Sequence, residues 1–113
     1  MSDIIIYATL TNPYARIIRV KDGYQCTAAT GAVAATVAWA NQAVAGTVDA
    51  TYVGGAKFTI PAALPTPSPY ASESYDFLVY NRAGATAASS DTLVLGKRIN
   101  WKNGAIVGEP ISL

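Results

Sequence analysis

Hydrophobic and polar positions alternate with a period of two along several stretches of the chain, which is the spacing of a β-strand. The clearest stretch is Ser74–Arg82, where large residues occupy both faces, so we predict a central strand there. Tyr14–Val20 alternates in the same way and leads into Asp22-Gly23, a pair that favours a tight turn, with a return strand over Tyr24–Thr27. The pattern therefore predicts antiparallel strands joined by hairpins.

Further strands are expected where β-branched and aromatic residues gather between turn signals. They are Ile4–Thr11, Thr47–Tyr52, Ala56–Ile60 and Asp91–Ile99, with a last hairpin at Asn103-Gly104. The alanine-rich stretch before Val48 mixes helix and strand propensities, and we predict one short helix near Thr36–Gln42. The prolines between Ile60 and Tyr70 predict a loop, with a polyproline ligand for an SH3-like groove as the alternative.

These elements predict an all-β fold. About seven to nine short strands with Gly and Pro turns are typical of a β-sandwich, either Ig-like or a small jelly roll. The chain has 113 residues, of which 51% are hydrophobic and 13% charged, and this length suits one hydrophobic core. We find no internal repeat and no linker, so residues 1–113 are predicted to form a single β-sandwich domain.

Composition then excludes several kinds of chemistry. The chain contains no histidine, which removes the usual general base near neutral pH and the commonest metal ligand. Its formal net charge is +1, too small for the basic surface that nucleic acid requires. The single cysteine, Cys26, lacks an activating base and is expected to pack as a small apolar residue. We expect neither an enzyme nor a nucleic-acid binder, and no metal or cofactor.

The apolar runs are too short for a membrane span or a secretory leader, so we expect the chain to be made in the cytosol and to have no membrane association. Glu73 and Asp76 could form a hydrolytic pair near Arg82, although carboxylates on one strand are usually solvated. A second charged group could contact nucleic acid or a glycan, but a charged rim of the first hairpin is the simpler interpretation. This group consists of Arg16, Arg19 and Lys21 with Tyr14 and Tyr24.

Both ends of the chain are apolar, which is unusual for exposed termini. Segments 2–6 and 106–113 either pair as edge strands within the fold or reach onto a neighbouring subunit by strand addition. Lys97, Arg98 and Lys102 form the densest basic cluster in the sequence, and this cluster could contact an acidic partner. The candidate interface residues are therefore Ile4, Ile5, Ile6, Lys97, Arg98, Lys102, Ile111 and Leu113.

Four segments together carry a resemblance to a known family. They are Tyr14–Gly23, Phe58–Pro65, Tyr80–Ala85 ahead of Asp91, and Ile99–Gly104. In this order they resemble a family of small β-rich structural proteins of tailed bacteriophages and prophages. The likeness extends from about Ile4 to Val107, and the chain departs from it in two places. Thr66–Tyr70 is a proline-rich insertion where the family usually has a shorter Pro-Ala-Gly turn, and Cys26 replaces a tryptophan.

The resemblance implies a virion accessory subunit. Its partners would be the major capsid protein or other virion proteins, together with further copies of itself in a homo-oligomer. The first expectation is a head decoration or cement protein that stabilises the capsid lattice. A neck, tail or fibre-associated subunit is the alternative, and a glycan-binding or host-surface-binding module is a second alternative of a different class.

Overall fold

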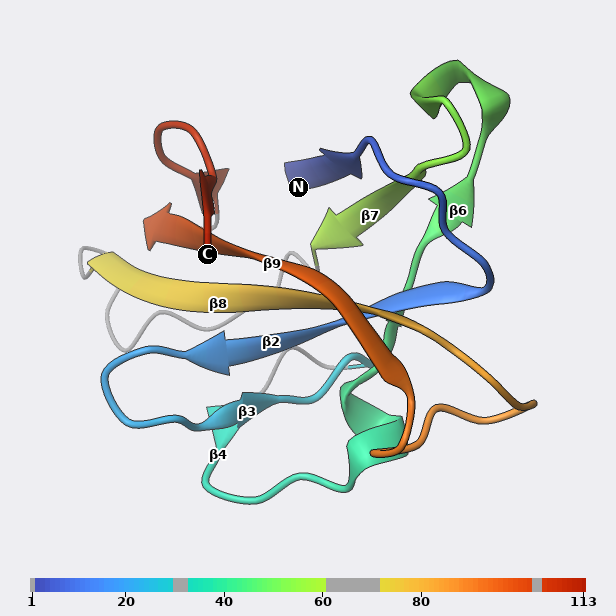
Figure 1. Ribbon diagram of the computed structural model, residues 1–113. Coiled ribbons are helices and arrows are strands. Elements are labelled where there is room, and N and C mark those ends of the chain that lie inside the picture. The colour runs from blue at the N-terminus through green and yellow to red at the C-terminus, as the bar shows by residue number, and fades with distance from the viewer. Residues whose placement is uncertain (1, 30–32, 61–71, 103–104) are drawn as a thin grey trace.

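The computed structural model describes residues 2–29, 33–60, 72–102 and 105–113 (Figure 1). Within them the fold is all-β, and two antiparallel sheets form a β-sandwich-like globule. The predicted fold class is therefore confirmed. The prediction for the proline-rich loop and the turn at Asn103-Gly104 lie outside the described residues.

The larger sheet is built on three long strands, β2 (Pro13–Arg19), β8 (Ser72–Asn81) and β9 (Thr92–Lys102). Its strand order is β10-β9-β8-β2-β3-β4, with β5 also paired to β2 and β11 to β9. The short strands are β3 (Gln25–Cys26), β4 (Val33–Ala34), β5 (Val44–Ala45), β10 (Ala105–Ile106) and β11 (Ile111–Ser112). As predicted, β8 lies in the middle, between β2 and β9.

The smaller sheet has the order β1-β7-β6. These strands are β1 (Ser2–Ile6), β7 (Ala56–Ile60) and β6 (Thr47–Val48). Two 3-10 helices complete the described elements, η1 (Trp39–Gln42) and η2 (Ala50–Tyr52). Figure 1 shows β1 and β7 apart from the layer that β9, β8 and β2 form.

The core lies between the two sheets. Because side chains alternate along a strand, β8 sends Tyr75, Phe77 and Val79 to the inner face, and all three are fully buried. Phe77 meets Phe58 of the smaller sheet edge to face, with ring centroids 5.4 Å apart. This contact joins the two sheets, and aromatic pairs of this kind add about 0.5–1.5 kcal/mol beyond their buried area.

Local side-chain chemistry accounts for one of the differences from the predicted elements. The strand predicted over Thr47–Tyr52 ends at Val48, because the Asp49 carboxylate accepts a hydrogen bond from the Thr51 backbone N–H at 2.8 Å and starts η2. The first strand ends at Ile6 and does not reach Thr11. The short helix predicted near Thr36–Gln42 is present as the single turn η1.

The predicted turns are largely where the sequence places them. Gly23 has φ +72° in the turn between β2 and β3, a conformation that glycine adopts readily. β9 has an irregularity opposite β8, because Val79 pairs with Leu95 whereas Tyr80 pairs with Leu93. Val94 is therefore the extra residue, and the strand continues past Gly96 in regular register.

Candidate interface formed by the terminal segments

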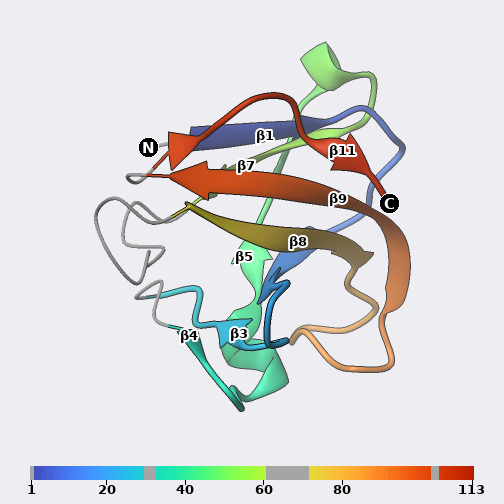
Figure 2. The same cartoon turned by 90° about the vertical axis from the view of Figure 1, so that its left-hand side faces the viewer.

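The two terminal segments lie next to each other at one edge of the sandwich. Figure 2 shows the chain between β10 and β11 passing over β1, with β11 running beside β9. Between these segments is a groove of about 360 Å³, lined by Asp3, Ile4, Ile5, Tyr7, Lys97, Glu109 and Pro110. The groove follows β1, which is an edge strand paired only with β7 among the described residues.

The three isoleucines of β1 have different environments. Ile4 pairs with Phe58 and Ile6 with Ala56, and these two isoleucines are 3% and 1% exposed in the core. Ile5 points the other way and is 37% exposed. Ile4 and Ile6 are thus core residues that leave little surface for a partner, and Ile4 also borders the groove. The pairing of β1 with β7 corresponds to the first alternative for the N-terminal segment, an edge strand within the fold.

The basic residues Lys97, Arg98 and Lys102 do not gather into one patch. Lys97 occupies an inner-face position and lines the groove, with its Nζ 3.5 Å from Ser112 Oγ. Arg98 points to the opposite, outer face and donates to the Asp76 carboxylate at 2.8 Å. Lys102 lies at the end of β9 beside a cavity of about 240 Å³. A single acidic partner would therefore not meet all three charges at once.

Ile111 and Leu113 lie on the outer face of the larger sheet. β11 pairs Ile111 with Arg98, and the Leu113 backbone N–H donates to the Gly96 carbonyl at 3.0 Å. Both side chains remain about 60% exposed. The C-terminal segment therefore pairs within the fold through its backbone and keeps its apolar side chains in contact with solvent.

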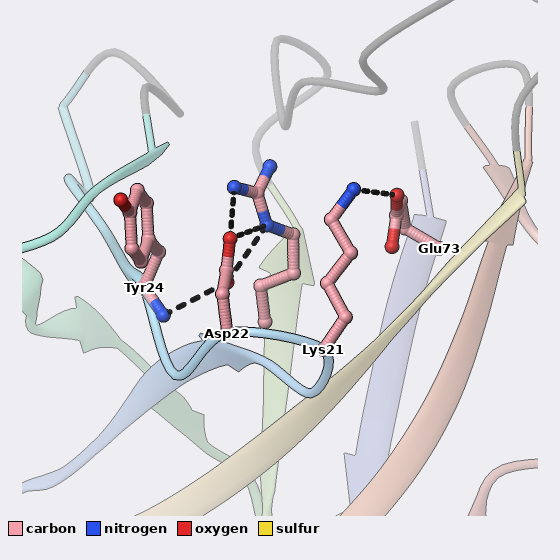
Figure 3. Close-up of polar contacts among 5 residues, drawn as sticks. Lys21, Asp22, Tyr24 and Glu73 are labelled. Atoms are coloured by element: carbon pink, nitrogen blue, oxygen red, sulfur yellow. Dashed lines mark hydrogen bonds and ion pairs between the residues drawn. The ribbon is translucent and has the colours of Figure 1, made fainter.

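The first hairpin forms a rim of paired charges (Figure 3). Arg19 Nε donates to Asp22 at 3.0 Å, and this hydrogen bond holds the pKa of the Asp22 carboxyl below its usual range. Lys21 reaches across to Glu73, with Nζ and Oε1 2.9 Å apart. Tyr24 lies against Arg19, whose guanidinium carbon is 5.2 Å from the ring centroid. Paired charges of this kind match the interpretation as a charged rim.

Arg16 is separated from this rim because it lies on the outer face. Its Nε donates to Gln42 at 2.8 Å and its Nη1 to the Tyr80 hydroxyl at 3.0 Å. The guanidinium also stacks on Trp39 of η1, 3.8 Å from the ring centroid. These contacts fasten η1 to the sheet, so the guanidinium of Arg16 is held by protein groups.

A buried hydrogen-bond network next to Arg16 is not apparent from the sequence. The Tyr14 hydroxyl donates to Asp91 at 2.6 Å and accepts from Trp39 Nε1 at 3.0 Å. Burial and the Asp91 contact raise the pKa of Tyr14 to about 12. Asp91 also accepts from the backbone N–H groups of Ala83 and Ala88, and these hydrogen bonds lower its pKa. This network joins β2, η1 and the loop before β9.

The remaining candidates for chemistry are kept apart by the fold. Glu73 and Asp76 lie on opposite faces of β8, bound to Lys21 and Arg98. Cys26 is 1% exposed, and burial raises the pKa of its thiol to about 11, which keeps the sulfur protonated at neutral pH. Among the described residues, no cluster of His, Cys, Asp and Glu could hold a metal ion. The same residues contain no helix long and apolar enough to span a bilayer.

Comparison with protein-family models, with curated proteins and with solved structures finds no match to this chain.

Proposed function

We propose that the chain is a structural, non-catalytic component of a tailed-phage virion, and that it acts as a head decoration or cement protein. The observation that carries this proposal is the open edge of β1 beside the terminal groove. An edge strand presents unpaired backbone N–H and C=O groups, and an extended segment of another protein can pair with them.

The side chains around this edge suit such an addition. Ile5 and Tyr7 are 37% and 69% exposed, so a strand arriving beside β1 would find apolar surface as well as backbone partners. Lys97 lies in the groove together with Asp3 and Glu109. We expect the occupant to be an extended arm of the major capsid protein with alternating apolar side chains, because strand pairing and shallow apolar contacts are what the groove offers.

The rest of the molecule is compatible with work done by contact alone. Several of its charges are neutralised in pairs, such as Arg98 with Asp76 and Lys21 with Glu73. The resemblance of the sequence to phage structural proteins supports the same assignment. In this proposal, further copies of the chain occupy equivalent positions on the particle and form a homo-oligomer.

Sedimentation with particles tests the proposal. Particles assembled from the genome that encodes the chain are purified on a density gradient, and the chain is measured by immunoblot in each fraction. The proposal predicts that the chain sediments with particles in a fixed ratio. If the chain remained at the top of the gradient while particles sedimented without it, the virion assignment would be overturned.

Charged substitutions on β1 and at the residue that follows it test the role of the edge. Ile5→Lys combined with Tyr7→Asp should reduce the chain on particles at least tenfold, because desolvating the two charges opposes docking. Val48→Lys is the matched control, since Val48 is 48% exposed on β6, the other edge of the same sheet. Equal recovery of both variants on particles would contradict docking at β1.

A further inference from the structure

The outer face of the larger sheet carries a second surface that the proposed function does not use. Residues directly opposite on paired strands share a face, so the registers define two rows across it. One row contains Ile18, Asp76, Arg98 and Ile111, and the next contains Arg16, Leu78, Gly96 and Leu113. Arg16 lies under η1, so the part of this face that a partner could reach is the part nearer β11.

Gly96 makes the apolar part of this surface continuous. A Cβ atom at this position would lie 3.0 Å from both Leu78 Cδ2 and Leu113 Cδ1. Because Gly96 has no side chain, Leu78 of β8 and Leu113 of the C-terminal segment can approach each other across β9. Leu93, which pairs with Tyr80 further along the face, adds a side chain that is 52% exposed.

The charges on this surface form one neighbouring pair of opposite sign. Arg98 donates to Asp76 through Nε at 2.8 Å and through Nη2 at 3.2 Å, and the two side chains keep 43% and 25% of their surface exposed. The guanidinium has further N–H donors, and the carboxylate has further lone pairs for a second partner. A protein surface of a single charge sign would be repelled by one member of the pair.

A second copy of the chain offers both features that this surface calls for, namely apolar side chains and a pair of opposite charges. A two-fold axis that lies in the interface, parallel to the sheet, and passes midway between Asp76 and Arg98 at right angles to the line joining them sets each carboxylate opposite the guanidinium of the other copy. The four charges then alternate in sign, and the apolar side chains of Leu78, Ile111 and Leu113 surround them. Such a contact is isologous, which means that the same patch is used on both partners.

We propose that the chain forms a symmetric dimer through the outer face of β8, β9 and β11, with Asp76 and Arg98 at its centre. This inference rests on the proposed function, because on the particle the dimer partner would be one neighbouring copy of each subunit. Strands about 4.8 Å apart and residues about 3.3 Å apart give a face of roughly 20 by 20 Å. This is smaller than the ~800 Å² per partner of stable complexes, so the dimer is weak in solution.

Charge reversal in the purified chain tests the dimer without any particle. Sedimentation velocity at concentrations up to about 1 mM should show reversible dimerisation of the wild type. Asp76→Arg alone and Arg98→Asp alone place four like charges at the axis, and each should raise the dissociation constant at least tenfold. An equimolar mixture of the two variants restores opposite charges and should form a heterodimer.

The controls separate this result from loss of folding and from the particle experiment. Circular dichroism establishes that each variant is folded. Leu113→Ser should weaken the dimer while Val48→Ser, on the smaller sheet, leaves it unchanged. A wild type that stays monomeric at about 1 mM, or single variants that dimerise as well as the wild type, would overturn the dimer. Sedimentation of the chain with particles would still decide the virion assignment independently.

Discussion

At the scale of residues, the network around Tyr14 and Asp91 holds three separate parts of the chain together. Asp91 accepts hydrogen bonds from the Tyr14 hydroxyl and from two backbone N–H groups in the loop that precedes it. A charged acceptor strengthens such hydrogen bonds, and the same hydrogen bonds lower the pKa of the Asp91 carboxyl. The stability of the fold should therefore depend on pH in acid, through Asp91, and in alkali, through Tyr14.

The first prediction concerns acid. Because the folded state lowers the pKa of Asp91, its contribution is present above the unfolded value of about 3.9 and is lost as pH falls through the folded value. Asp91→Asn should lower the urea midpoint at pH 7 and reduce the further loss of stability on going to acid. Urea unfolding of both proteins across the acid range measures this, and parallel pH curves would contradict it.

The second prediction concerns alkali. Burial raises the pKa of Tyr14 and of Tyr75 to about 12, above the unfolded value of about 10. The unfolded chain therefore releases these protons first, and the stability they provide is lost as pH rises from about 10 toward 12. Absorbance of tyrosinate during an alkaline titration should show two groups that ionise near pH 12 or together with unfolding. Complete ionisation near pH 10 with the fold intact would contradict the burial of these hydroxyls.

Sequence alone could not predict this network. Tyr14 and Asp91 are 77 positions apart, and alternation shows only that each lies in or beside a strand. Their meeting depends on β2 pairing with β8 and on the path of the loop from Ala83 to Asp91. By contrast, the buried position of Cys26 was predictable, because a free cysteine usually packs as a small apolar residue.

At the scale of elements, β1 is the strand whose role the structure changes most. From the sequence, residues 2–6 could form an arm, in which case their deletion would leave a folded domain. In the structure, Ile4 and Ile6 complete the core against Phe58 and Ala56. Deletion should therefore unfold the domain, and the edge of β1, rather than the whole strand, is what remains for a partner.

Substitutions within β1 provide the third prediction. Ile6→Ala should lower the free energy of unfolding by about 2–5 kcal/mol, the cost of removing a buried aliphatic side chain. Ile5→Ala, one residue away on the exposed side, should change it by no more than about 0.5 kcal/mol. Chemical denaturation measures both, and equal losses would show that β1 is not held in the register described.

The turn that leads into β7 provides the fourth prediction. Gly55 is buried, and a Cβ atom there would overlap the backbone carbonyl oxygen of Ile6. Gly55→Ala should therefore force β1 and β7 apart and lower the thermal midpoint strongly or prevent folding. Gly84→Ala is the matched control, because a Cβ atom at Gly84 meets nothing within 4 Å. Similar midpoints for the two variants would contradict the close approach.

Strand prediction succeeded where alternation and turn chemistry agreed, as in β2, β7 and β8. It was wrong over Thr47–Tyr52, where Asp49 captures a backbone N–H and favours a 3-10 turn over continued strand. Alternation also could not place Lys97 and Arg98 relative to Lys102, because the pattern does not show which face is buried until the strands are paired. Lys97, Arg98 and Lys102 therefore form a cluster in the sequence only, and the fold separates them.

At the scale of the whole molecule, the groove beside β1 and the outer face of the larger sheet are the two surfaces proposed for contact. The groove beside β1 presents a strand edge, whereas the outer face presents apolar side chains around one ion pair. A subunit with one surface for the capsid and one for its own copies can link positions on a lattice. We infer these two surfaces from the geometry of the fold, because the sequence predicts only the β-sandwich and its apolar ends.

We propose that the chain works as a subunit of a virion, and an averaged electron microscopy image of intact particles is the decisive test. The image should show density for the β-sandwich on the head, in roughly hundreds of copies, with β1 against the major capsid protein. Roughly six or twelve copies at the neck or tail would move the subunit away from the capsid lattice. Particles with no density for this chain would overturn the proposal.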